Sequence, residues 1–129
     1  MADAARSFHI TVQNLIGREW TRTKFGLGGG IWSDNGSAVP PEKIPPARLD
    51  NDGDLAPGMI KFESESNGFA TGTEGTTSYT SNKGNITISW DNPFAGANGF
   101  GVAVPAGYVA EHTPIGGNNA YVTVTIRKA

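Results

Sequence analysis

Hydrophobic and polar residues alternate with a period of two in four separate stretches of the chain. Such alternation is typical of strands in an antiparallel sheet that has one buried face and one face in water. The positions in between are mostly polar, so each stretch is predicted to be a strand whose apolar side faces a core. The apolar positions are Phe8, Ile10 and Val12; Ile60 and Phe62; Ile86, Ile88 and Trp90; and Val122, Val124 and Ile126.

Weaker alternation predicts further strands at Glu19–Phe25, Thr76–Thr80 and Phe100–Val104. No stretch keeps a helical periodicity of 3.6 residues for more than two turns. The 18 glycines and 8 prolines favour many turns. The sequence therefore predicts an all-β fold in which two antiparallel sheets pack face to face as a β-sandwich. A chain of 129 residues can bury a core, and residues 1–129 are expected to form a single domain.

The segment from Ser33 to Gly58 departs from this pattern, since it holds five prolines and almost no alternation. A connection of this length in a compact domain is usually functional or mobile. The plainer interpretation is a surface flap that covers a sheet edge. The sequence assigns this segment no role.

The charge and the N-terminus limit the classes of partner. The formal net charge is −2 and the chain has no cysteine. A nucleic-acid binder needs a basic footprint, so this class is excluded, as are disulfides and thiolate metal sites. The first residues, Met1–Ser7, lack the apolar segment of a secretory signal peptide. We expect synthesis as a soluble cytoplasmic protein, which leaves by another route or on cell lysis if it acts elsewhere.

Two short motifs suggest ion or phosphate binding, but each lacks a required part. Asp50–Asp54 (DNDGD) begins like a calcium loop, yet Leu55 and Lys61 stand where the EF-hand pattern needs Gly and Glu. Gly26–Gly30 is rich in glycine, yet no helix or Gly-Lys-Ser/Thr motif is expected to follow it. We interpret the first as a surface turn and the second as a glycine-rich bend, and we predict no metal and no cofactor.

Residues suited to catalysis are sparse. The chain has two histidines, His9 and His112, and no Gly-x-Ser-x-Gly motif. His9 lies on the polar side of the first predicted strand and is expected to be solvated. Glu63, Glu65 and Glu74 could supply paired carboxylates, but the first two fall on the polar side of a strand. We predict that the protein is not an enzyme.

Aromatic residues near turns are the unusual feature, above all in Ser89–Gly101 (SWDNPFAGANGFG). Trp90 is in phase with the strand before it and is expected to anchor the loop in the core. Phe94 follows a turn signal and is expected to be offered to a membrane or a partner, with Phe100 as a second candidate. Trp32, beside glycines and a polar turn, is the other candidate.

Two longer segments resemble the aegerolysin family. They are Glu65–Thr76 (ESNGFATGTEGT) and Trp90–Gly96 (WDNPFAG), and Phe8–Asn14 and Gly29–Trp32 are similar to further motifs of that family. The resemblance extends over nearly the whole chain. Within the family, the likeness is greatest to the small components of bacterial two-part insecticidal proteins, such as the binary crystal proteins of Bacillus.

The resemblance implies a sandwich like that of the actinoporins, recognition of membrane lipid, and pore formation with a larger partner protein. It also implies synthesis in a bacterial cytoplasm without a signal peptide, and later release to act at a target-cell membrane. Fungal members bind sphingolipid with aromatic and polar groups at one end of the sandwich. By motif, Trp32, Trp90, Asp91 and Phe94 occupy matching positions. Thr71 stands where fungal members carry a lipid-selecting Glu, which argues against the fungal selectivity for sphingomyelin and cholesterol.

The predicted function is therefore that of a non-enzymatic toxin component. Its predicted lipid-binding residues are Trp32, Thr71, Trp90, Asp91, Phe94 and Phe100. Its expected partners are a larger pore-forming protein and membrane lipids, with sphingolipid as the candidate class. Free sheet edges are compatible with a homodimer. The alternative is a glycan-binding module, in which Asp91-Asn92 and Asn118-Asn119 would bind sugar hydroxyls.

Overall fold

Two β-sheets packed face to face make up the structure, a computed structural model that describes residues 6–16, 20–34, 37–38, 48–49, 58–68 and 70–129. The described residues form eleven strands and no helix. In chain order the strands are β1 (Ser7–Asn14), β2 (Trp20–Gly29), β3 (Ile31–Asp34), β4 (Ser37–Ala38), β5 (Arg48–Leu49), β6 (Gly58–Glu65), β7 (Thr73–Ser81), β8 (Gly84–Asn92), β9 (Gly99–Ala103), β10 (Tyr108–His112) and β11 (Asn119–Lys128).

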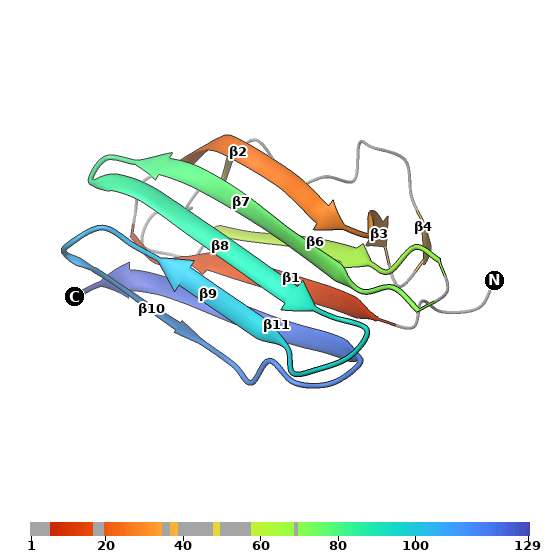
Figure 1. Cartoon of the computed structure of the whole chain (residues 1–129). Coiled ribbons are helices and arrows are strands. Elements are labelled where there is room, and N and C mark those ends of the chain that lie inside the picture. Colours follow the sequence, from red (N-terminus) through yellow and green to blue (C-terminus); the bar gives the residue numbers. More distant parts are fainter. Residues whose placement is uncertain (1–5, 17–19, 35–36, 39–47, 50–57, 69) are drawn as a thin grey trace.

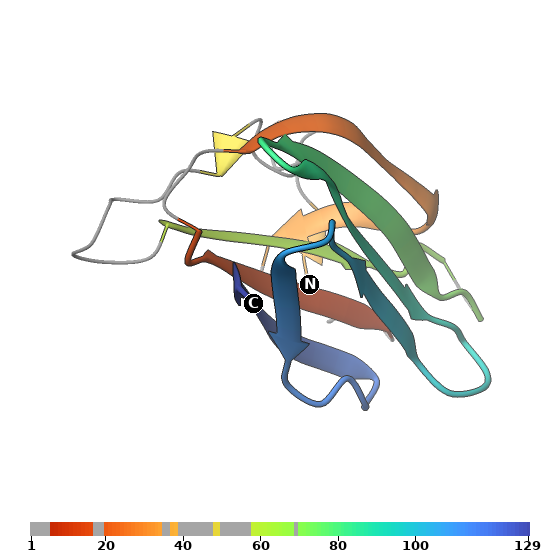
Figure 2. The same ribbon diagram turned by 90° about the vertical axis from the view of Figure 1, so that its left-hand side faces the viewer.

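The six-stranded sheet has the order β10-β11-β1-β6-β3-β4, and the five-stranded sheet has the order β5-β2-β7-β8-β9. Figure 1 shows β2, β7 and β8 in one layer and β1, β6 and β11 in the other. The two layers are also separate in the view turned by 90° (Figure 2). This arrangement confirms the predicted all-β sandwich.

The core lies between the sheets and is built from the positions that the alternation marks as apolar. Because successive side chains of a strand point to opposite faces, every second residue of β1, β8 and β11 enters it. All of these core residues are at most 5% exposed: Phe8, Ile10, Val12, Phe62, Ile86, Ile88, Trp90, Val122, Val124 and Ile126. The side chain of Ile60, also predicted to be apolar core, lies outside the described part.

The strand pairing departs from the prediction at one place, because β1 and β11 run parallel. Alternation is the same whichever way two strands pair, so the sequence pattern could not show the direction. The alternation also missed β3 and β10, which are short and carry no clean period of two. The glycine-rich stretch is mostly strand rather than bend: β2 continues to Gly29, and the left-handed residue is Gly30, with φ of 87°.

The long proline-rich segment is described only in part. Of Ser33–Gly58, the described residues contribute the end of β3, the short strands β4 and β5, and the first residue of β6. The predicted turn at Asp50–Asp54 lies outside the described residues.

Two polar positions are more enclosed than predicted. His9 is half-buried rather than solvated: its Nδ1 lies 3.1 Å from Glu63 Oε2, and its ring stacks on Tyr121 at 4.0 Å between centroids. These contacts arise because β6 and β11 flank β1 and place both residues directly opposite His9. Glu65, predicted to be on a polar face, is only 5% exposed and is flanked by β1 and β3.

The buried Tyr79 makes the stability of this core depend on pH. It is fully buried, and its ring centroid lies 6.4 Å from that of Trp20. Burial raises the pKa of Tyr79 to about 12, although the hydrogen bond with Thr77 and the charge of Arg22 act in the opposite direction. In the unfolded chain the phenol ionises near its ordinary pKa of about 10. Its stabilising effect is therefore complete below about pH 10 and is lost as the pH rises toward about 12.

We expect the free energy of unfolding to fall by about 1 kcal/mol more in the wild type than in Tyr79→Phe between about pH 10 and pH 11. Urea denaturation of both proteins at each pH measures this difference. The phenylalanine variant shares every other titrating group, so equal slopes for the two proteins would contradict the assignment.

Candidate functional site

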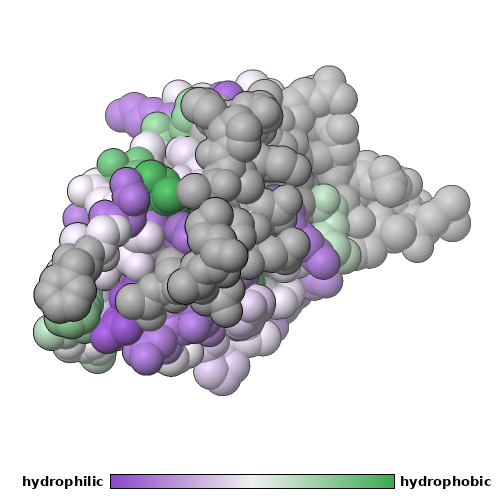
Figure 3. Space-filling model, turned by 90° about the vertical axis from the view of Figure 1, so that its right-hand side faces the viewer, coloured by the Kyte–Doolittle hydropathy of each residue, from purple (hydrophilic) through white to green (hydrophobic). Residues whose placement is uncertain are grey.

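All six predicted lipid-binding residues lie toward one end of the sandwich, which we call the aromatic end. β8 finishes there, and β3, β7 and β9 begin there, at the right-hand side of Figure 1. Figure 3 looks onto this end, and its coloured residues show small hydrophobic areas among more hydrophilic ones. The residues are Trp32, Thr71, Trp90, Asp91, Phe94 and Phe100.

Trp90 is the inner support of the aromatic end. It is 3% exposed, and its ring centroid lies 5.5 Å from that of Phe62 and 6.0 Å from that of Trp32. The indole Nε1–H donates to Ser64 Oγ at 2.9 Å, and the Thr73 hydroxyl donates to the same oxygen at 2.7 Å. Because the indole is enclosed and fully paired, Trp90 joins the two sheets from within. Trp32 is half-buried against it.

Phe94 is the most exposed of these residues, at 45%. Arg6 holds its loop in place from the start of the first strand. The Arg6 Nη2 donates to the Phe94 carbonyl at 2.8 Å and its Nε donates to the Pro93 carbonyl at 3.3 Å. The guanidinium also lies 5.2 Å from the centroid of the Phe94 ring. The ring is therefore presented by a fixed backbone rather than by a free loop.

Asparagine amides brace the loops around Phe94. The side chain of Asn92 is 1% exposed, and its Nδ2 lies within hydrogen-bond distance of the carbonyls of Ser7, Gly117 and Asn118. Asn98 Nδ2 donates to the carbonyls of Ile115 and Gly117. Asn92 therefore acts inside the fold, and not as the exposed sugar-binding group that the glycan alternative needs. Between these loops and Arg6 lies a hollow of about 330 Å³.

The other predicted site residues face in different directions. Phe100 is half-buried on the inner side of β9, with its ring centroid 5.7 Å from Phe8 and 5.0 Å from His112. Asp91 is half-buried on the outer face of the five-stranded sheet. The Thr71 hydroxyl donates to the carbonyl of Gly68 within its own turn. The assignment of the six residues to lipid binding stays a prediction.

One side-chain set has the connectivity of a catalytic triad. Ser7 Oγ lies 2.9 Å from His9 Nε2, and the opposite nitrogen of the ring faces Glu63. However, Ser7 is fully buried, and its hydroxyl donates to Asn119 Oδ1 at 2.7 Å. A triad needs a serine that meets substrate and gives its proton to the histidine. This set therefore lacks an accessible nucleophile and acts as a polar link between β1, β6 and β11.

Within the described residues, no group of three or more histidine, cysteine or acidic side chains is arranged to hold a metal ion. The same part of the chain contains no helix long and apolar enough to cross a membrane.

Arg6 is the residue of this end that sequence reasoning missed. Its contacts with Pro93 and Phe94 join positions 87 and 88 residues apart. No local pattern marks such a pair. The only signal in the sequence is a cation immediately before the first strand.

Comparisons with known proteins bear on the whole chain. The model of the Aegerolysin family matches residues 5–129. An uncharacterized protein of Dictyostelium discoideum is 32% identical over 127 residues, which are 96% of this chain and 10% of that protein. The chain thus spans about a tenth of the length of this curated relative.

Solved structures share the fold at low sequence identity. IP-1A from Alcaligenes faecalis matches with a TM-score of 0.73 and 19% identity, over 98% of this chain and 93% of that chain. The lipid binding protein Nakanori matches with a TM-score of 0.70 and 14% identity, over 98% of this chain and 72% of that chain. At these identities the likeness shows the fold alone.

Proposed function

This chain belongs to the aegerolysin family, and from that membership we propose that it is a non-enzymatic toxin component that binds membrane lipid through its aromatic end. A larger partner protein completes the pore. The partner's part rests on the resemblance of the ESNGF and WDNPFAG segments to the small components of two-part insecticidal proteins. The lipid binding protein Nakanori, which shares the fold, supports the first step.

The observation that carries the proposal is the fixed and exposed ring of Phe94. Transfer of a large apolar side chain out of water contributes about 1.5–3 kcal/mol when the side chain starts fully exposed. Arg6 already holds the backbone at Pro93 and Phe94, so little ordering of the loop opposes insertion. An interfacial aromatic residue that needs no unfolding suits reversible attachment to a bilayer surface.

One ring does not account for stable attachment. Millimolar affinity already corresponds to about 4 kcal/mol of binding free energy. The net charge of −2 gives no general attraction to anionic lipid. Specific contacts with a head group must therefore add to the ring, and the hollow between Arg6 and the bracing asparagines is the place for them.

Cosedimentation with vesicles of varied composition tests this function. The vesicles contain phosphatidylcholine alone, or with sphingomyelin or ceramide phosphoethanolamine, each with and without cholesterol. We expect binding to one sphingolipid class and little binding to phosphatidylcholine alone. Folded protein that sediments with none of these vesicles would contradict lipid binding by this chain.

A further inference from the structure

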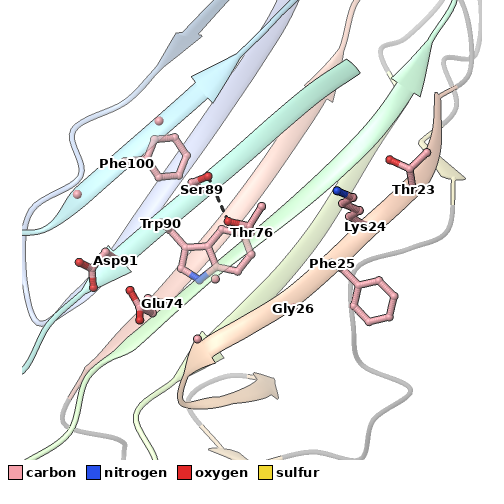
Figure 4. A pocket seen from close by; sticks show the side chains of 14 residues that line it. Thr23, Lys24, Phe25, Gly26, Glu74, Thr76, Ser89, Trp90, Asp91 and Phe100 are labelled. Carbon is pink, nitrogen blue, oxygen red and sulfur yellow. Dashed lines mark hydrogen bonds between the residues drawn. The ribbon is translucent and has the colours of Figure 1, made fainter. Parts of the chain in front are cut away.

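A larger hollow than the one beside Phe94 lies on the outer face of the five-stranded sheet. It is a groove of about 880 Å³ over β2, β7, β8 and β9. Its floor is formed by residues that alternate with the buried ones: Trp90 points into the core, so Ser89 and Asp91 point outward. Figure 4 shows these side chains together with Thr76 and Glu74 along the groove.

Glycine occupies alternate positions on both sides of the groove, at Gly26 and Gly28 in β2 and at Gly99 and Gly101 in β9. No described atom lies within 4 Å of a Cβ built at Gly26 or at Gly101. Neither residue has a left-handed backbone that would require glycine. Glycine weakens a strand interior and often marks a site where a ligand approaches the backbone closely. The side walls of this groove are therefore bare where side chains would fit and would stabilise the strands.

The floor of the groove carries two carboxylates that are not used by the fold. Glu74 and Asp91 stand directly opposite each other on β7 and β8. Within the described part of the chain, neither carboxylate makes a hydrogen bond or an ion pair. Like charges at directly opposed positions destabilise a sheet. The next outward pair, Thr76 and Ser89, adds two hydroxyl groups that form a hydrogen bond with each other at 3.2 Å.

We propose that this groove binds an uncharged oligosaccharide. Free carboxylates accept hydrogen bonds from hydroxyl groups, and the Thr76 and Ser89 hydroxyls both donate and accept. The bare glycine walls give the apolar face of a sugar ring close contact with the backbone. The proposal does not rest on lipid binding, since the walls at Gly26 and Gly101 do not line the hollow beside Phe94.

Charge and length disfavour a phospholipid head group in the groove. The paired carboxylates of Glu74 and Asp91 repel a phosphate. The cation that could attract one, Lys24, is opposite Ser78, four residues from Glu74 and thus about 13 Å along the sheet. A zwitterionic head group is too short to reach both charges, whereas a chain of several sugar rings spans them.

Amide proton–nitrogen correlation spectra of the full chain test this site. The probes are maltotriose, cellotriose, mannotriose and N-acetylchitotriose, with phosphorylcholine as the head-group control. We expect one of the neutral trisaccharides to shift the amides of Thr76, Ser89 and Gly101. Gly26→Val and Gly101→Val fill the groove and are expected to weaken this binding about tenfold or more without lowering the melting temperature.

Ala103→Val is the matched control, because Ala103 is exposed on the same face of β9, two residues after Gly101, but lies outside the groove. It is expected to bind the trisaccharide as the wild type does. Groove shifts from none of the trisaccharides, shifts from phosphorylcholine instead, or an equal loss in Ala103→Val would each overturn the proposal. Vesicle cosedimentation of the groove variants distinguishes a failure of this proposal from a failure of lipid binding. If the groove variants sediment with vesicles as the wild type does, lipid binding by the aromatic end is unaffected, whether or not a trisaccharide binds.

Discussion

Replacement of Phe94 by alanine is expected to weaken vesicle binding about tenfold, because nearly half of the ring is still available to leave water on insertion. Cosedimentation at increasing lipid concentration measures the change. The thermal stability is expected to change little, since the exposed ring contributes little to the core. Combination with Trp32→Ala is expected to increase the loss to about a hundredfold if both rings enter the same bilayer.

The chain offers a close control for this experiment. Phe25 is 42% exposed and Phe94 is 45% exposed. Each ring also lies under an arginine: Arg22 is 4.0 Å from the centroid of Phe25, and Arg6 is 5.2 Å from that of Phe94. Phe25→Ala thus removes a phenyl ring of similar exposure, also in contact with an arginine, but from β2 rather than from the loop after β8. Equal losses for the two variants, or none for either, would show that the aromatic end is not the membrane contact.

The parts of the fold that could be predicted are those fixed by local alternation. A strand with one buried face needs an apolar residue at every second position, so Ile86, Ile88 and Trp90 indicated both β8 and its orientation. The parallel pairing of β1 with β11 depends on how distant segments meet. Alternation carries no information on that, and family resemblance was the stronger guide to the architecture.

The location of the candidate residues at one end of the sandwich was predictable, and the contacts around them were less so. The loop chemistry of Asn92-Pro93 indicated a turn after β8 and thus an exposed Phe94. The support by Arg6 was not predictable, because it spans most of the chain. The groove had a local signal: Gly26 and Gly28, like Gly99 and Gly101, are spaced by two and therefore share one face of a strand. This signal was missed because the glycines of Gly26–Gly30 were interpreted only as a bend.

Replacement of Trp90 by alanine is expected to have the largest effect on stability, a loss of about 3–5 kcal/mol in the free energy of unfolding. The indole fills the space between Phe62 and Trp32, and it packs so closely on Gly75 that a Cβ built there would lie 2.5 Å from Trp90 Cζ2. Ser64→Ala keeps the ring but leaves its N–H buried without an acceptor, and we expect a loss of about 1–3 kcal/mol. Urea denaturation followed by tryptophan fluorescence measures both.

The two variants also separate an anchoring role of Trp90 from direct lipid contact. If Trp90 only anchors the core and does not contact lipid, Ser64→Ala lowers the stability of the protein. The folded variant is then expected to bind vesicles as the wild type does, since the outer surface at Phe94 is unchanged. Trp90→Phe, which keeps a ring in the core, is then expected to bind in the same way below its melting temperature. A folded Trp90→Phe protein that loses vesicle binding as Phe94→Ala does would instead place the indole among the lipid contacts. Its enclosure by Phe62, Trp32 and Ser64 argues for the first result.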